Sequence, residues 1–295
     1  MGKATRIRQQ NAREKIAAQR AAERRAEQRR RLFITGGSVL AVIAIVVAFI
    51  IVKSMSSPTT TPSSAARTPL PASVASQVTG VPASALAAVG KGSVITSTAP
   101  VTKVSGPPLT SNGKPEMLYI GAEYCPYCAA MRWSMAVALS RFGTLSTPLH
   151  GIHSASNDSF PNTATLTFYK TGYNSKYLTF TPVENLTVDR SLLQSPTAAQ
   201  NQIWARYEPD ASQRGYPFID IGNRYVIKGP IYDPGVLEGL TWSQIAADLH
   251  DPSSPVAQGV LGAANYITAA ICKTTNNQPA SVCAAPPIKA VAGGL

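Results

Sequence analysis

The pattern of apolar and polar positions divides the chain into four stretches of different character. Residues 1–31 are rich in Arg, Ala, Glu and Gln, which favours a helical basic arm. Residues 32–52 contain no charged side chain, and at about 1.5 Å per residue they are long enough to cross the roughly 30 Å hydrocarbon core of a membrane. Residues 53–77 are rich in Ser, Thr and Pro, which predicts a flexible linker. We therefore expect one folded domain at residues 78–285 and a disordered tail at 286–295.

Within residues 78–285, the periodicity predicts strands that alternate with helices, and hence an α/β fold. A short apolar strand at 117–121 precedes a helix at 129–142 that Gly143 ends. Two strand-like runs follow, at 165–169 and 177–181, and they form either a hairpin or a core strand followed by an edge strand. The other predicted elements are helices at 82–90, 195–207, 242–249 and 254–272, an edge strand within 93–104, and a hairpin at 217–227 around Gly222-Asn223.

The chemistry of the chain centres on Cys125-Pro126-Tyr127-Cys128, which lies between the strand at 117–121 and the helix that follows. A strand that leads into a helix whose first turn carries Cys-x-x-Cys is typical of thioredoxin-like redox proteins. Two intervening residues place both sulfurs within one helical turn, close enough for a disulfide. The helix N-terminus favours a thiolate on Cys125, the predicted nucleophile, while Cys128 begins the apolar stripe and is the predicted resolving partner.

The Cys-x-x-Cys also has two alternative interpretations that involve no redox chemistry. A Cys-x-x-Cys can be half of a zinc site, but a structural zinc site needs two more ligands at compatible spacing. The other cysteines, Cys272 and Cys283, lie far away in the sequence, and His150, His153 and His250 have no clustered acidic or cysteine partner. An inert structural disulfide is the second alternative. We predict no metal site and no cofactor.

The residues around the motif resemble two known families. Residues 121–128 read Gly-Ala-Glu-Tyr-Cys-Pro-Tyr-Cys, similar to the Ala-Glu-Trp-Cys-Gly-Pro-Cys run of thioredoxins, with Tyr124 in place of the tryptophan. Residues 119–133, continued by 138–143, resemble more closely a family of actinobacterial and archaeal membrane-anchored proteins known as DUF929. That resemblance covers about residues 78–285. It implies a thioredoxin-like fold and brings no established substrate.

The thioredoxin resemblance also assigns a role to Pro217. In such proteins a cis-proline begins a hairpin that faces the Cys-x-x-Cys, and Pro217 in Gly-Tyr-Pro-Phe-Ile-Asp-Ile is the matching position. Tyr216 is then expected to contact substrate, together with Tyr124 and Tyr127, whereas a trans-proline at a strand start is the alternative. Nearly ninety residues separate Cys128 from Pro217, which implies an insertion at about residues 144–210.

Several polar residues near the motif are candidates for proton handling. Glu123, two residues before the nucleophile, is either a proton shuttle or an exposed, solvated carboxylate. Arg132 either favours the thiolate electrostatically or faces solvent. The acidic residue that thioredoxins bury beneath the active site falls on Tyr119 here, so the chain departs from that family at this position.

Cys272 and Cys283 are expected to form a structural disulfide that staples a C-terminal helical extension, because disulfides persist in oxidising compartments. A relay of electrons between this pair and the Cys125–Cys128 pair is the alternative.

Charge is concentrated at the N-terminus. Residues 1–31 hold eleven Lys and Arg against three Glu, so they carry +8 of the formal net charge of +12. A basic arm alone can bind nucleic acid, but basic residues before an apolar run mark the cytoplasmic flank of a membrane span. A cleaved signal peptide usually has a shorter apolar region of about 7–15 residues and a small-x-small cleavage site, which is missing here. We predict an uncleaved single-pass anchor in the cell membrane, a cytoplasmic N-terminus, and no nucleic-acid partner.

These inferences combine into one predicted function. The chain is expected to be a membrane-anchored, extracytoplasmic thiol-disulfide oxidoreductase that acts on protein thiols and disulfides and exchanges electrons with a membrane redox partner. Whether it oxidises, isomerises or reduces depends on a reduction potential that Pro126-Tyr127 alone does not set. The alternative is a non-catalytic binding module of the same fold in the cell envelope, in which the cysteines are only a brace.

Overall fold

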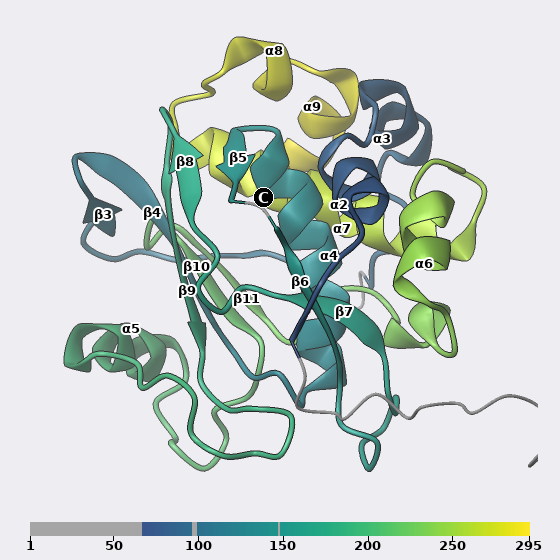
Figure 1. Cartoon of the computed structure of the whole chain (residues 1–295). Helices are drawn as coiled ribbons and strands as arrows, with labels where there is room; N and C mark the ends of the chain where they lie inside the picture. Colours follow the sequence, from purple (N-terminus) through teal and green to yellow (C-terminus); the bar gives the residue numbers. More distant parts are fainter. Residues whose placement is uncertain (1–66, 96–98, 147) are drawn as a thin grey trace, which may run out of the picture. The chain divides into compact units, whose positions relative to one another are not determined.

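The computed structural model describes residues 67–95, 99–146 and 148–295 (Figure 1). The predicted basic arm, the apolar run at 32–52 and most of the predicted linker lie outside the described residues. Within those ranges no single helix is both long and apolar enough to span a membrane. Helices α2 (Ala72–Thr79) and α3 (Ala83–Val89), bent by 60° at their junction, meet that criterion only as a pair.

The described residues form a mixed α/β fold around one central sheet, which confirms the predicted class. Its middle strand is β4 (Lys114–Gly121), the strand that leads to the cysteines. On one side β4 pairs in parallel with β9 (Thr179–Glu184), and on the other side it pairs antiparallel with β10 (Phe218–Ile221). The remaining strands of this sheet are β11 (Tyr225–Lys228), β2 (Thr102–Lys103) and β3 (Thr110–Ser111).

Side chains alternate between the two faces of β4, and each face is covered by helices (Figure 1). Met117 and Tyr119 belong to the larger hydrophobic cluster, which includes α4 (Pro126–Ser140) and α7 (Pro255–Thr274). Leu118 and Ile120 belong to a second cluster, which includes Trp204 of α5 (Ala198–Tyr207). The sheet therefore lies between α4 and α7 on one face and α5 on the other.

Helices α4 and α7 are buried on nearly every side, and they pack against each other. The sequence predicts a single apolar stripe on α4, but Arg132 and Ser134 are also buried because neighbouring elements cover the opposite side of the helix. Close approach of α7 to the segment after α3 depends on Gly92, whose φ of +56° is left-handed and whose Cβ would collide with the carbonyl of Gln258.

Of the two alternatives for residues 165–169 and 177–181, the hairpin is wrong. The first run is β7 (Ala164–Thr167), which pairs with β6 (His150–His153), while the second begins β9 in the central sheet. Alternation shows that one face of a strand is buried, but it does not identify the partner strand. The smaller sheets are completed by β1 (Thr68–Pro69) beside β6, and by the pair β5 (Gly143–Leu145) and β8 (Tyr173–Ser175).

The ordered fold extends beyond both predicted domain boundaries. Helix α2 begins inside the predicted linker, which was expected to continue to residue 77, and its Val74 is buried. Helix α9 (Pro286–Ala292) replaces the predicted disordered tail and buries Ile288 and Val291, packing against α7. Short runs rich in Ala, Val and Pro have the composition of a flexible linker. These two are ordered because they pack against the rest of the fold.

Helix termini follow local capping chemistry. Thr197 caps α5 through a capping box with Gln200, so the helix begins three residues after the start predicted at residue 195. Ser254 caps α7 with Pro255 at its first position. The other helices are α6 (Trp242–Asp248), α8 (Ala280–Cys283) and a 3₁₀ helix, η1 (Pro234–Leu237).

Candidate functional site

Cys125 is the N-cap of α4, directly after the loop that follows β4. Its sulfur accepts a hydrogen bond from the backbone N–H of Cys128, with an N···S distance of 3.3 Å, and Pro126 occupies the first helical turn. Both thiols are free. Cys125 retains 4% of its accessible surface, and Cys128 is completely buried.

The two thiols differ in acidity. Hydrogen bonding with Cys128 lowers the pKa of Cys125 below its ordinary value and outweighs the opposing effect of burial, and the charge of Arg132 acts in the same direction. Burial raises the pKa of Cys128 well above its ordinary value. Cys125 therefore loses its proton before Cys128 does. A nucleophile and a resolving thiol require this difference in acidity.

A second segment, distant in sequence, meets the cysteines. The Tyr216–Pro217 peptide bond is cis, as the resemblance to thioredoxins implies. The thiol of Cys125 donates to the carbonyl of Tyr216 at 3.7 Å. The strand β10 begins at the next residue and pairs with β4, so the sheet itself brings Pro217 beside the start of α4.

Tyrosine rings surround the exposed edge of Cys125. The rings of Tyr124 and Tyr216 meet edge to face, with centroids 6.3 Å apart, and both pack against the small cluster that contains the two cysteines. Tyr127 packs there too and lies edge to face with Phe160 at 6.0 Å. All three predicted substrate-binding tyrosines are thus gathered at one place.

Residues that the sequence did not indicate complete this surface. The Arg190 guanidinium lies 4.5 Å from the centre of the Tyr124 ring and donates to Asn157 Oδ1 and Asp158 Oδ2. The Tyr216 hydroxyl donates to Asn185 Oδ1. The loop after β9 therefore reaches over the site, and no sequence motif marks it.

Glu123 is buried, so the predicted alternative of an exposed carboxylate is wrong. Its carboxylate forms a two-point ion pair with Arg67, with an Nη2···Oε2 distance of 2.7 Å, and accepts a hydrogen bond from the Thr167 hydroxyl at 2.8 Å. A buried carboxylate needs such partners. Glu123, two residues before Cys125, is thereby connected to the N-terminal end of the described fold. Its role as a proton shuttle stays a prediction.

Arg132 does not face solvent. It is completely buried, and its Nε and Nη2 donate to the two carboxylate oxygens of Glu184 at 2.9 and 2.7 Å. The same Nη2 donates to the carbonyl of Ala122, whose N–H contacts the sulfur of Cys128 at 3.5 Å. Glu184 ends β9, and a charged residue at the end of an apolar strand was the one signal that could have revealed it.

Tyr119, which the sequence resemblance aligns with the buried acid of thioredoxins, is completely buried. Burial raises the pKa of its hydroxyl well above the ordinary value, and the neighbouring Cys128 contributes in the same direction. Gly121 accommodates this side chain, since a Cβ at that position would collide with the Tyr119 hydroxyl. A neutral phenol and a buried ion pair therefore lie beneath the cysteines.

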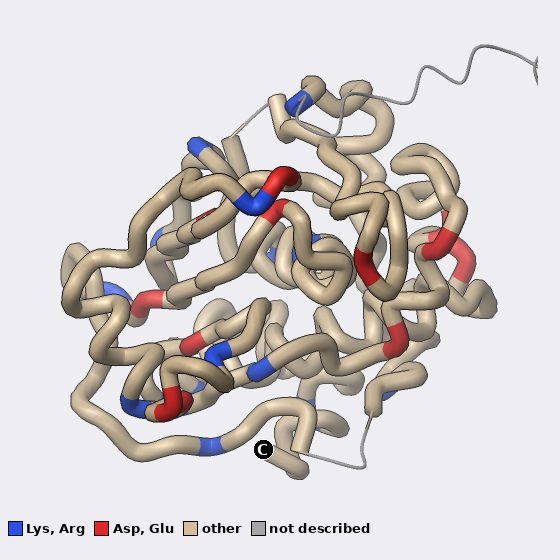
Figure 2. The backbone as a smooth tube through the Cα atoms, turned by 90° about the horizontal axis from the view of Figure 1, so that it is seen from below, with Lys and Arg blue, Asp and Glu red and all other residues tan. Residues whose placement is uncertain are grey.

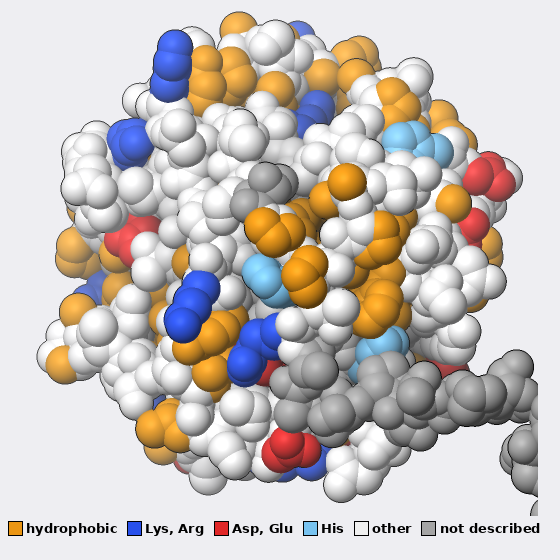
Figure 3. Space-filling model, in the orientation of Figure 1, with side chains coloured by type: hydrophobic (Ala, Val, Ile, Leu, Met, Phe, Trp, Pro, Cys, Tyr) orange, Lys and Arg blue, Asp and Glu red, His pale blue; other side chains and the backbone are white. Residues whose placement is uncertain are grey.

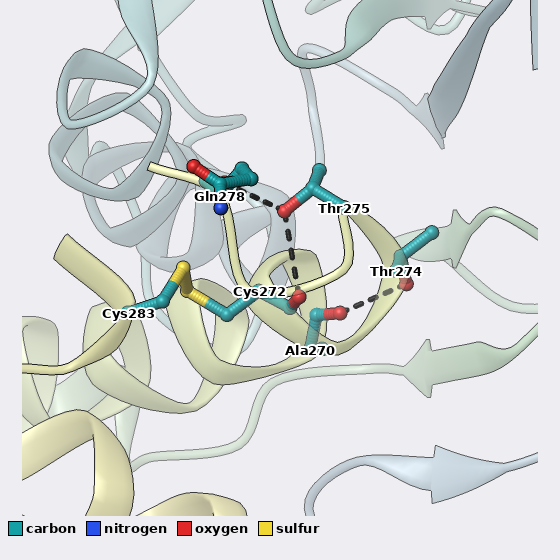
Figure 4. Close-up of a disulfide and its surroundings, with 6 residues drawn as sticks. All are labelled: Ala270, Cys272, Thr274, Thr275, Gln278 and Cys283. Carbon is teal, nitrogen blue, oxygen red and sulfur yellow. Dashed lines mark hydrogen bonds between the residues drawn. A yellow bond between two sulfur atoms is a disulfide. The ribbon is translucent and has the colours of Figure 1, made fainter. Parts of the chain in front are cut away.

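Cys272 and Cys283 form the predicted disulfide, with a Cα–Cα distance of 5.5 Å (Figure 4). The turn between them is fixed by the Thr275 hydroxyl, which donates to the carbonyls of Cys272 and Gln278. Because both sulfurs are bonded, they offer no thiolate to a metal. Within the described ranges, no group of three or more His, Cys, Asp or Glu side chains lies close enough to hold a metal ion.

Charged residues are sparse along the described backbone, and positions of both signs are spread over it (Figure 2). On the face seen in Figure 3, Lys and Arg side chains are scattered among uncharged ones. The strongly basic character of the chain therefore comes from residues 1–31.

A family model described as a domain of unknown function, DUF929, matches residues 100–273, which include β4, the two cysteines, Pro217 and most of α7. No curated protein and no solved structure matches the chain. The match covers more than half of the chain, so the protein belongs to the DUF929 family.

Proposed function

We propose that this protein is a membrane-anchored thiol-disulfide oxidoreductase of thioredoxin-like fold that acts on protein thiols and disulfides outside the cytoplasm. The observation that carries the proposal is the contact between Cys125, at the start of α4, and the backbone carbonyl before cis-Pro217. The acidic thiol of Cys125, the buried thiol of Cys128 and the backbone beside Pro217 lie close together.

The topology supports the thioredoxin-like fold. The strands β9, β4, β10 and β11 lie side by side, β4 and β9 are parallel, and β10 and β11 are antiparallel to their neighbours. The cysteine helix follows the second strand of that order, and α5 covers the opposite face (Figure 1). On this proposal, the inserted segment is the part that carries β5 to β8 between α4 and β9, which is shorter than the predicted insertion at 144–210.

The reaction is a pair of thiol-disulfide exchanges. The thiolate of Cys125 attacks one sulfur of a substrate disulfide, an S–S bond forms between enzyme and substrate, and the other substrate sulfur leaves as a thiolate. Cys128 then loses its proton and attacks the sulfur of Cys125, which releases the second substrate thiolate. Two electrons and two protons pass from the enzyme dithiol to the substrate. Run in reverse, the same steps oxidise a substrate dithiol.

Access to the sulfur sets a condition on the substrate. Cys125 is nearly covered, so an incoming sulfur has to approach between the rings of Tyr124 and Tyr216. Both rings have apolar faces and a polar hydroxyl, which suits an extended peptide segment around a cysteine. We propose these two residues, with Tyr127 and Pro217, as the substrate-binding surface.

The membrane anchor and its orientation are proposed from residues 1–52. An uncharged run of this length after a strongly basic arm is typical of a single-pass anchor with a cytoplasmic N-terminus. The oxidised or reduced site then requires a partner that restores it, and we propose a membrane protein with a dithiol or disulfide of its own.

The proposal is tested with the Cys128→Ser and Cys125→Ser variants of the full chain. Cys128→Ser lacks the resolving thiol, so it should accumulate mixed disulfides with envelope proteins on non-reducing gels that vanish on reduction, whereas Cys125→Ser should accumulate none. In the reduced wild type, iodoacetamide should label Cys125 below the pH at which an ordinary thiol reacts. Equal trapping by both variants, or two thiols of ordinary acidity, would contradict the proposal.

The near-complete burial of Cys125 favours one other function, a binding module in which the cysteines only brace the loop. That function predicts that both single serine variants lose stability equally and trap no partner. The trapping experiment therefore separates the two functions directly.

A further inference from the structure

A buried cation lies beneath the cysteine pair with one of its nitrogens unpaired. Nε and Nη2 of Arg132 are directed to Glu184 and to the carbonyl of Ala122. Nη1 is also buried and has no hydrogen-bond partner among the described residues. An unpaired, buried N–H group of a charged side chain is costly, and this one lies on the helix that carries both cysteines.

The two charges of the Arg132–Glu184 ion pair do not affect the cysteines equally, because the pair is oriented. Arg132 belongs to the same helix as Cys125 and Cys128, one turn beyond Cys128, whereas Glu184 lies on β9. Arg132 lowers the pKa of both thiols, so the positive end of the pair is the one that acts on the cysteines. In a poorly solvated interior such a charge acts strongly at short range.

The other titratable and charged groups around the thiols are accounted for. Tyr119 from β4 is kept neutral by burial, and the pKa values of Tyr124 and Tyr216 are also raised mainly by burial. Glu123 is paired with Arg67. Arg190 lies over the Tyr124 ring and is also ion-paired, with Asp158. Arg132 is the cation that lowers the pKa of both thiols.

We propose that Arg132 is a positioning residue for the cysteine pair: its buried charge, held in place by Glu184, stabilises the thiolate of Cys125 and makes the Cys125–Cys128 disulfide a stronger oxidant. This inference rests on the proposed function and assigns its direction, toward donation of disulfides. Stabilising the thiolate stabilises the reduced form of the site, and a stabilised reduced form raises the reduction potential.

The equilibrium is measured against glutathione, so that the electrons balance. Two glutathione thiols reduce the Cys125–Cys128 disulfide to the dithiol and become one glutathione disulfide, with two electrons and two protons transferred. The full chain in detergent is equilibrated with buffers of known glutathione ratio, quenched with acid and alkylated to give the fraction reduced. The second readout is the pH profile of iodoacetamide labelling at Cys125. Neither readout requires a protein substrate.

Three variants separate charge from structure. Arg132→Met combined with Glu184→Gln removes both charges together, because removing only one partner of a buried ion pair is strongly destabilising. Arg132→Lys keeps the charge and loses the two-point geometry. Arg141→Met is the matched control, since Arg141 caps the C-terminal end of α4, has a buried Nη1 with no partner among the described residues, and lies about 20 Å along the helix from Cys128.

The double variant should shift the glutathione equilibrium by about tenfold toward the disulfide, which corresponds to about 30 mV, and should move Cys125 labelling to higher pH. Arg132→Lys should restore most of both properties, and Arg141→Met should leave both at the wild-type values. The inference would be overturned if the double variant had the wild-type glutathione equilibrium and labelling profile, or if Arg132→Lys had those of the double variant. In either case early labelling of wild-type Cys125 would still support an oxidoreductase. If the wild type itself labels like an ordinary thiol, it is the proposed function that fails.

Discussion

At the scale of single residues, the buried polar side chains differ in whether they have partners. Glu123, Arg132 and Glu184 are held by ion pairs close to the cysteines. Asp220 on β10 is also buried, but only its Oδ1 is satisfied, by the backbone N–H of Asn223, while Oδ2 has no partner among the described residues. Burial raises the pKa of Asp220 to about 6.

This makes the stability of the fold depend on pH. Because the folded pKa of about 6 exceeds the ordinary value of 3.8, the folded state binds the proton more tightly than the unfolded state. The stability that the folded state gains from binding this proton more tightly is fully present below about pH 4 and is lost as the pH rises through about 6. Asp220→Asn keeps the acceptor for Asn223 and removes the charge, so at pH 7 it should stabilise the protein by about 1–3 kcal/mol.

The measurement is urea unfolding of both proteins at pH 4 and pH 7. The gain should be present at pH 7 and nearly absent at pH 4. An equal gain at both values would show that the charge of Asp220 is not its cause.

At the scale of elements, the C-terminal helices depend on a covalent link. The disulfide joins the last turn of α7 to α8, and α9 packs back onto α7. The alternative role as an electron relay makes a different prediction from a staple, because a relay would change the redox state of Cys125 and a staple would not.

Replacing both residues, Cys272→Ala with Cys283→Ala, should lower the free energy of unfolding by about 3 kcal/mol, as expected for a closed loop of this length. Thermal and denaturant unfolding measure this loss. Under folded conditions the labelling rate of Cys125 and its glutathione equilibrium should be unchanged. A shift in that equilibrium would instead support the relay.

At the scale of the whole described fold, residues before 78 are part of the structure around the cysteines. β1 adds to the sheet beside β6, Leu70 is buried, and Arg67 forms an ion pair with Glu123, two residues before Cys125. The segment that leads from the proposed anchor is therefore in direct contact with the cysteine loop.

A protein that begins at residue 78 should therefore be several kcal/mol less stable than one that begins at residue 62, because it leaves a buried carboxylate unpaired. Glu123→Gln should recover part of that loss in the shorter protein and destabilise the longer one. Thermal unfolding of the four proteins tests this. Equal stability of the two lengths would show that the N-terminal segment only rests on the surface.

Much of this structure follows from local sequence. Proline and serine at the start of α7, the Gly222-Asn223 turn, and the Cys-x-x-Cys between a strand and a helix are short-range signals, because capping, turn conformation and helical spacing involve residues only a few positions apart. They predicted the cysteine helix and the hairpin of β10 and β11, and the resemblance to thioredoxins added cis-Pro217.

The partners of buried charges could not be predicted in this way. Arg132 with Glu184, and Arg67 with Glu123, join residues more than fifty positions apart, and the buried charges are tolerated because a segment distant in sequence supplies each partner. The same holds for α2 and α9, whose composition resembles a tether until a packing surface is present. The sequence alone thus determined which sulfur opens a helix, and only the tertiary structure decided which charges surround it, because solvation and pairing depend on neighbours in space.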